Sequence, residues 1–109
     1  MKFRLILSAR AESDIEGIVG YLVQRSPQGA AAWCDRWEEV LGELRERPLG
    51  FGRAPESSQH DADIRQVLFK TRRGRTYRAL FTVIEAGVYI IHVRGPGQDF
   101  VPSEELRLP

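Results

Sequence analysis

The sequence predicts a single α+β domain in which a hairpin of two helices packs on a small antiparallel sheet. Residues 9–47 carry apolar side chains at the three- and four-residue spacing of helices. Residues 64–94 hold three runs rich in Val, Ile, Phe and Tyr, and the loops between them contain Gly74 and Gly87, which is typical of an antiparallel meander. A chain of 109 residues, 42% hydrophobic and 28% charged, has the size and composition of one globular domain over residues 1–109.

Composition excludes several classes of protein. No apolar run approaches the roughly 20 residues that cross a bilayer, and the start, Met1-Lys-Phe-Arg, lacks the apolar region of a signal peptide. We therefore expect a cytoplasmic protein without a membrane partner. Cys34 is the single cysteine, and its place in a helical pattern predicts a small buried side chain. The Cys and His residues of the chain are Cys34, His60 and His92, and they do not form a cluster with the spacing of a zinc site. We therefore expect no metal site and no other cofactor.

The first elements are a strand over residues 3–7 and a helix over 9–24, for which Ser8 is a good N-cap. Gly17 and Gly20 lower the helix propensity and would permit close approach of a second helix. The apolar residues at helical spacing are Ala11, Ile15, Ile18, Val19 and Leu22.

The second helix begins after Ser26, with Pro27 at the first helical position. It ends near Arg47, because Pro48 disfavours helical backbone at the residue before it. The short connection between the two helices predicts an antiparallel hairpin. The apolar stripe of the second helix consists of Ala30, Trp33, Cys34, Trp37, Leu41 and Leu44.

Trp33 and Trp37 lie one turn apart on this stripe and have two interpretations. In the first, both pack in the core against the sheet. In the second, they line a partly exposed groove that receives an apolar segment of a partner. The sequence leaves both open.

Residues 48–63 form a loop by composition, long enough to suggest mobility or a function, with His60 as a solvated loop residue. From about residue 95 an extended tail is expected, with at most one turn, at 103–106. The strands of the meander are expected at residues 64–70, 77–84 and 88–94.

Alternation along the middle strand sets the environment of Arg78. It places Arg78 mid-sheet on the same face as apolar neighbours, so this arginine needs a partner. That partner is either an external ligand or a structural one in the tail, such as Asp99. The two predicted faces are Tyr77, Ala79, Phe81 and Val83, and Arg78, Leu80, Thr82 and Ile84.

Charge is unevenly distributed, although the net charge is only +1. Residues 10–47 hold eight acidic and five basic residues, a net −3, whereas residues 64–84 hold six basic and no acidic residues. Such a basic patch can bind phosphate or an acidic protein, or, around 72–75, can be a solvated hairpin tip. Its members are Arg65, Lys70, Arg72, Arg73, Arg75 and Arg78.

Several of these segments together resemble the RelE/ParE family of toxins from bacterial type II toxin–antitoxin, or plasmid stabilisation, modules. The resemblance covers residues 3–94 and implies the element order β-α-α-β-β-β. The motifs that carry it are Ala11-x-x-Asp14-Ile15-x-x-Ile18-x-x-Tyr21, Tyr77-Arg78-Ala-Leu-Phe and Ile91-His92-Val93-Arg94.

The resemblance implies one of two activities. RelE-like members cut mRNA on the ribosome without a metal, with arginines that hold the scissile phosphate; ParE-like members poison DNA gyrase. In the nuclease case the catalytic residues would be Arg78, Arg94 and His92. Strand alternation predicts Val88, Ile90, His92 and Arg94 on one face, where His92 and Arg94 could converge with Arg78. The alternatives are a structural role for Arg78 and a satisfied sheet histidine at 92.

Departures from the nuclease pattern favour the ParE-like activity. Where nuclease members carry lysines on the first meander strand, this chain has Val67, Leu68 and Phe69, followed by Lys70. Phe100, rather than a tyrosine, is the nearest aromatic residue after the last strand. The low net charge also fits poorly with ribosomal RNA as a partner.

Both activities imply a cognate antitoxin and a toxin–antitoxin hetero-oligomer. We expect an extended antitoxin segment to cross the helix hairpin with apolar anchors and then to reach the sheet beside Arg65 and Arg78. Its carboxylates would form charge-assisted hydrogen bonds with arginines. The residues expected to bind the target or antitoxin are Arg65, Arg72, Arg73, Arg75, Trp33 and Trp37.

Overall fold

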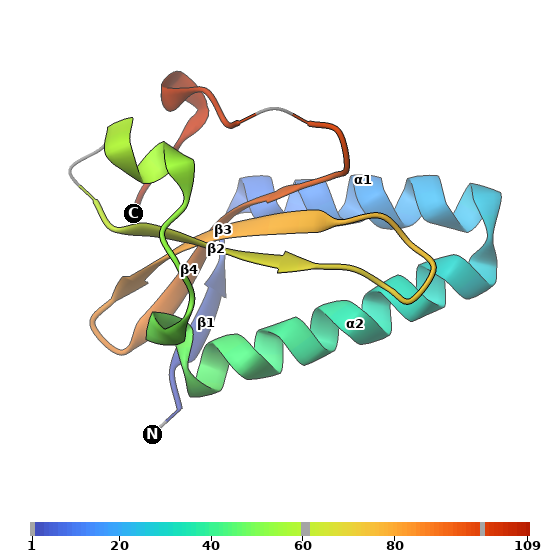
Figure 1. Cartoon of the computed structure of the whole chain (residues 1–109), viewed down its shortest axis with the longest axis horizontal. Coiled ribbons are helices and arrows are strands. Elements are labelled where there is room, and N and C mark those ends of the chain that lie inside the picture. The colour runs from blue at the N-terminus through green and yellow to red at the C-terminus, as the bar shows by residue number, and fades with distance from the viewer. Residues whose placement is uncertain (1, 60–61, 99) are drawn as a thin grey trace.

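The computed structural model describes residues 2–59, 62–98 and 100–109. Its strands and helices follow one another as β1 (Arg4–Leu7), α1 (Ala9–Arg25), α2 (Pro27–Glu46), β2 (Ile64–Phe69), β3 (Tyr77–Ile84) and β4 (Gly87–Arg94). Three short 3-10 turns lie at Pro48–Gly50, Pro55–Gln59 and Ser103–Glu105. The two helices cover one face of the sheet, and the loop before β2 and the C-terminal tail lie on the other side (Figure 1). The predicted α+β class and element order are confirmed.

The helix boundaries follow from the capping residues that the sequence shows. The Ser8 hydroxyl accepts a hydrogen bond of 2.9 Å from the Ala11 N–H, and Ser26 accepts one of 3.0 Å from Gly29. Both arrangements satisfy a backbone donor that has no partner inside its helix. Pro27 stands in the first turn of α2, and the helix ends at Glu46, one residue before Arg47, as the following proline requires.

The sheet has the strand order β1-β4-β3-β2. The antiparallel meander of β2, β3 and β4 agrees with the prediction. The first strand differs, because β1 joins β4 in parallel, with Arg4 opposite Gly87 and Leu7 opposite Ile90. The sheet is therefore mixed. Strand alternation alone does not reveal the direction of pairing, because both directions place side chains on alternate faces.

A β-bulge interrupts the pairing of β3 with β4. Leu80 lies opposite His92, but Phe81 lies opposite Ile90, so Ile91 is the extra residue. The bulge separates the alternation before it from the alternation after it. Val88 and Ile90 belong to the helix-side core, while Arg94 lies opposite Arg78 on the other face. The prediction that Val88, Ile90, His92 and Arg94 share one face is wrong for this reason.

The chain has two apolar clusters, one on each face of the sheet, and the predicted faces of β3 are confirmed. The helix-side cluster is larger and includes Trp33, Trp37, Val40, Leu44, Val67, Phe69, Ala79, Phe81, Val88, Ile90 and Val93. The outer cluster, beneath the loop and tail, consists of Ala54, Ile64, Leu80, Ile91, Val101 and Leu106.

Two expectations about the helices are wrong. Cys34 is exposed, because the buried line of α2 runs through Trp33, Trp37 and Val40, and Cys34 lies at its edge. Gly17 and Gly20 face open space, since no atom lies within 4 Å of the position that a Cβ would take at either residue. They do not serve close helix packing inside this chain.

The loop before β2 makes more contacts with the rest of the fold than its composition suggested. The Ala54 N–H donates to the Ile64 carbonyl at 2.7 Å, and Arg53 forms an isolated bridge with Arg65, so the loop covers the outer edge of β2. The expected single turn of the tail is present at Ser103–Glu105. His60 lies outside the described residues. No helix in the described part of the chain is long and apolar enough to cross a membrane.

Candidate functional site

The outer face of the sheet holds the residues that the sequence suggested for catalysis. Arg78 and Arg94 stand opposite each other in the β3–β4 pair, and His92 lies opposite Leu80 on the same side. The expected convergence of the three positions on one face is therefore found. What the sequence did not reveal is how these side chains are engaged.

Arg78 has an internal partner in the loop. Its Nη1 and Nη2 donate to the two carboxylate oxygens of Glu56 at 2.8 and 2.7 Å, and Nη1 also donates to Gln66 at 3.2 Å. The side chains of Arg78 and Glu56 are 14% and 0% exposed. The Phe100 ring centroid lies 5.6 Å from the guanidinium carbon. Asp99, the suggested structural partner, is outside the described residues.

Glu56 is held in its charged form. Burial by itself would raise the pKa of this carboxyl, but hydrogen bonds from Arg78 and from the Val101 N–H outweigh burial and lower the pKa. The Val101 bond is 2.8 Å long, so one carboxylate ties the loop, β3 and the tail together. Arg78 and Glu56 thus form a buried bidentate ion pair.

His92 is buried between the tail and α1. Its Nε2 lies 3.0 Å from the Glu105 carbonyl oxygen, and because a carbonyl only accepts, Nε2 carries the proton. Nδ1 is 3.7 Å from an Asp14 carboxylate oxygen and has no hydrogen-bond partner among the described residues. Burial lowers the pKa of His92, so the ring is neutral at pH 7. An external substrate has no direct access to this side chain, which is 1% exposed.

Arg65 lies on the other face of the sheet from Arg78. It pairs with Phe81 in the β2–β3 register and binds the carbonyl oxygens of Leu49 and Phe51 at 3.3 and 2.6 Å. Its Nε donates to Asp63 at 2.9 Å. Strand alternation therefore separates Arg65 from Arg78 by the thickness of the sheet, and the expected path of an antitoxin segment along both stays a prediction.

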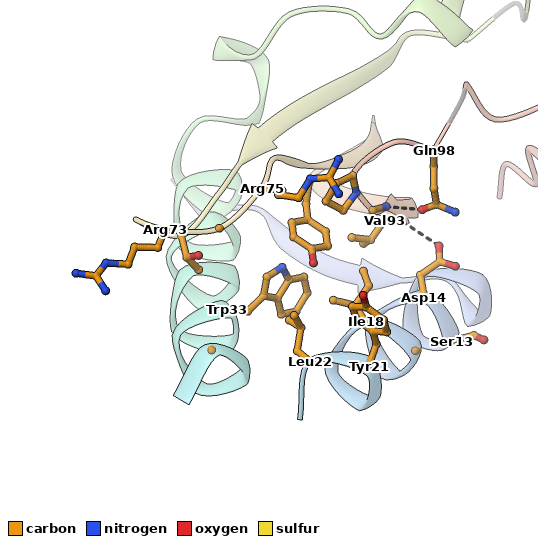
Figure 2. A pocket seen from close by; sticks show the side chains of 17 residues that line it. Ser13, Asp14, Ile18, Tyr21, Leu22, Trp33, Arg73, Arg75, Val93 and Gln98 are labelled. Carbon is orange, nitrogen blue, oxygen red and sulfur yellow. Dashed lines mark hydrogen bonds between the residues drawn. The ribbon is translucent and has the colours of Figure 1, made fainter. Parts of the chain in front are cut away.

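A cavity of about 790 Å³ opens at the end of the helix hairpin, between α1, α2, the β2–β3 loop and the chain after β4 (Figure 2). We call it the hairpin cavity. Its apolar wall consists of Ile18, Leu22, Trp33, Tyr77 and Val93. Arg73 and Arg75 also line it, although the Arg73 side chain extends away from the cavity (Figure 2). Arg72, in the same loop, is exposed and does not line it.

Trp33, Tyr77 and Asp14 bring polar groups to the lining of the hairpin cavity. The Trp33 Nε1 is buried and without a partner among the described residues. Burial raises the pKa of Tyr77, and the neighbouring Tyr21 raises it further, whereas the charge of Arg75 opposes the shift. The Tyr77 phenol therefore remains protonated at pH 7. The carboxylate of Asp14 is already engaged, since Arg10 donates to it at 2.8 Å. The Val93 N–H also donates to it, at 3.0 Å (Figure 2).

Trp33 and Trp37 are 2% and 6% exposed, with ring centroids 6.0 Å apart, so core packing is confirmed and no open groove exposes them. Each nevertheless borders a pocket. Trp33 lines the hairpin cavity, and both tryptophans line a shallower pocket of about 460 Å³ on the other side of α1. Their contact with an antitoxin stays a prediction.

Sequence reasoning found Trp33, Arg73 and Arg75 but missed the tyrosines of the hairpin cavity and Glu56. Tyr21 and Tyr77 stood in the family motifs, yet nothing in their spacing shows that both reach the same cavity. Glu56 gave no signal, because it is one polar residue in a polar loop. Over residues 2–59, 62–98 and 100–109, the structure gathers no three His, Cys, Asp or Glu side chains that could hold a metal ion.

Comparisons with known proteins agree on the fold. No protein-family model and no curated protein matches the chain. A chain of the chromosomal ParDE TA system from P. aeruginosa superposes with a TM-score of 0.63 at 20% identity, over 85% of this chain and 95% of that one. The E. coli toxin RelE, in a double arginine-to-alanine mutant in the free state, gives 0.53 at 18% identity, over 89% and 86%. The chain therefore has a RelE/ParE-like fold, as its motifs suggested.

Proposed function

We propose that this chain is the toxin of a type II toxin–antitoxin module and that it acts without cutting RNA. In this proposal it is ParE-like: it inhibits growth through a macromolecular target such as DNA gyrase, in the cytoplasm, and is neutralised by a cognate antitoxin. The structural likeness to a ParDE system supports the class of protein. The choice between activities rests on the outer face of the sheet.

One observation carries that choice, the bidentate pair of Arg78 with buried Glu56. A phosphate-binding arginine has to offer its donors to the substrate. Here the guanidinium donates to two carboxylate oxygens and to Gln66, and Phe100 lies against it. A scissile phosphate would have to displace a carboxylate that has no exposed surface. Arg78 is thereby better suited to holding the fold than to catalysis.

The first test is growth. Expression of the chain in a host that lacks its neighbouring open reading frame should arrest growth, and co-expression of that neighbour should relieve the arrest. A gyrase assay should then accumulate cleaved DNA, and cells should induce the SOS response while mRNA stays intact. Normal growth on expression of the chain alone contradicts the proposal.

The second candidate is a RelE-like, ribosome-dependent endoribonuclease. It is favoured by the juxtaposition of Arg78 and Arg94 and by the likeness to RelE. Primer extension after induction separates the two activities: cuts at codon boundaries identify the nuclease, and toxicity with uncut mRNA removes it. In the nuclease, replacing a phosphate-binding arginine lowers the rate by about a hundredfold or more.

A further inference from the structure

The hairpin cavity has an apolar wall, and Arg75 of the β2–β3 loop is among its lining residues. Ile18, Leu22 and Trp33 supply apolar surface from the two helices, and Figure 2 shows these three side chains gathered at the cavity. The indole N–H of Trp33 has no partner in the described part of the chain, but it is buried and offers no open donor to the cavity. A volume of about 790 Å³ is ample for one large side chain and its neighbours. The cavity thus suits a ligand that is apolar in part and carries an acceptor for Arg75.

The charges around the cavity specify the acceptor. Arg75 lines the cavity (Figure 2), and the guanidinium carbon of Arg25, which is not a lining residue, lies 4.6 Å from the ring centroid of the lining residue Tyr21. The acidic residue of the wall, Asp14, is neutralised by Arg10. The rim is therefore cationic, and its complement is a carboxylate.

The pocket on the other side of α1 has the opposite character. It is lined by Glu12, Glu16 and Glu38, and no Lys or Arg is among its lining residues. Trp33 borders both spaces, so one indole separates a cationic cavity from an anionic pocket. A partner with acidic and apolar residues would distinguish the two sides of the hairpin by charge.

We propose that the hairpin cavity receives an aromatic or branched apolar side chain of the antitoxin. A carboxylate of a neighbouring antitoxin residue binds Arg75. The identity of the partner rests on the proposed function, but the chemistry of the site does not. The antitoxin contact thus lies on the helix side, at Trp33 and Arg75, and not at the internally paired Arg78.

The chemistry is tested with two small probes of equal shape and opposite charge, 3-phenylpropionate and 3-phenylpropylamine. The chain has two tryptophans, so the NMR spectrum has two indole N–H signals, and Trp37 serves as the internal control. The carboxylate probe should shift the Trp33 signal saturably, with a Kd on the order of a few mM for a ligand of this size. Equal or tighter binding of the amine overturns the proposal.

Arginine variants locate the carboxylate. Arg75→Gln should weaken 3-phenylpropionate by about fivefold or more, since it removes the charge at the rim. Arg72→Gln, three residues earlier in the same loop, is the matched control and should leave Kd within about twofold. An unchanged Kd for Arg75→Gln means that the site is not the one described.

Glycine variants test occupation by the antitoxin. Gly17 lines the cavity and has open space at its Cβ position, so Gly17→Leu fills the mouth and also raises helix propensity. Gly20→Leu is the matched control, because Gly20 has the same open space on the same helix but does not line the cavity. Gly17→Leu should weaken antitoxin binding by about tenfold or more, while Gly20→Leu leaves the affinity near that of the wild type.

The same variants separate this inference from the proposed function. Cells that express wild-type chain alone should arrest, and failure to arrest rejects the function. Cells that express Gly17→Leu should need more antitoxin for growth than cells that express the wild-type chain, because neutralisation is weakened. Rescue of Gly17→Leu at the same antitoxin level as the wild type overturns the cavity as the antitoxin's binding site and leaves the toxin function intact.

Discussion

The two faces of the sheet are closed in different ways. On the helix face, two amphipathic helices cover an aromatic cluster in which Trp37 and Phe69 lie 5.5 Å apart between ring centroids. On the outer face, a loop and a tail without long helices cover a smaller apolar cluster and the ion pair of Arg78 with Glu56. Burial of apolar surface stabilises the helix face. The outer face depends on burial of apolar surface and also on the carboxylate of Glu56.

The difference has a consequence for robustness. Apolar burial is non-directional, so the helix face tolerates substitutions that conserve volume. The outer face depends on one geometry, because removing either partner of a buried pair leaves an uncompensated charge. We therefore expect the loss of stability to depend on the change in side-chain size for substitutions on the helix face. For substitutions at the ion pair of the outer face, we expect it to depend on whether a charge is left without its partner.

The largest effect is expected on the helix face. Trp37→Ala should lower the free energy of unfolding by about 4 kcal/mol, because truncating a buried aromatic removes transfer energy and leaves a cavity. Trp37→Phe should recover more than half of that loss. Urea denaturation followed by circular dichroism measures both. Equal losses for Ala and Phe would show that size does not govern this face.

The next effect breaks the ion pair. Glu56→Ala should cost about 3 kcal/mol, because Arg78 keeps its charge at a buried site without its partner. The matched double substitution, Glu56→Leu with Arg78→Leu, should be more stable than Glu56→Ala, since no charge is left buried. A denaturation cycle over the wild type, Glu56→Leu, Arg78→Leu and the double variant gives the coupling energy. If the single and double variants lose the same stability, the pair does not close the outer face.

The smallest effect is a pH dependence of the outer face. The folded-state pKa of His92 is lowered, chiefly by burial, so the unfolded chain binds a proton first as the pH falls below the ordinary value of 6.5. The contribution of neutral His92 to the free energy of unfolding is therefore fully present above pH 6.5 and is lost as the pH falls below it. Asp14 favours the protonated ring, and Arg10 and Arg94 oppose it.

Thermal unfolding at pH 7.5 and 5.5 measures this dependence. The wild type should lose Tm between the two values, and His92→Gln, which does not titrate, should lose less. Glu56 adds a pH dependence in a second, more acidic range. Because its folded-state pKa is lowered, the stability that it contributes is lost only as the pH falls below the ordinary value of 4.5. Identical Tm changes for wild type and His92→Gln between pH 7.5 and 5.5 would remove His92 as a cause.

The sequence predicted what depends on neighbours along the chain. Ser8 and Ser26 determine the helix starts, and alternation determines which face of β3 holds Phe81 and which holds Arg78. The direction of β1, the bulge at Ile91 and the partnership of Glu56 depend on contacts between distant segments. Nothing in the local pattern encodes these contacts, so the motifs located Arg78 correctly and missed what binds it.

The hairpin cavity was missed for the same reason. Its walls come from α1, α2, the β2–β3 loop and the end of β4, which meet only in the folded chain. Trp33 and Arg75 were each identified from composition, as an aromatic on a stripe and as a charge in a basic loop. Their proximity to Tyr21 and Tyr77 is a property of the tertiary structure.

The parallel pairing of β1 with β4 has a consequence for synthesis. β1 is the first strand to leave the ribosome, and its neighbour in the sheet is the last; the Ser8 hydroxyl donates to the Ile91 carbonyl across 83 positions. At roughly 5–20 residues per second, this interval lasts several seconds. In the later part of that time the helix hairpin is complete, but the sheet that covers its aromatic stripe still lacks β4. A ribosome that stops before Gly87 therefore releases a chain without the strand that both β1 and β3 pair with.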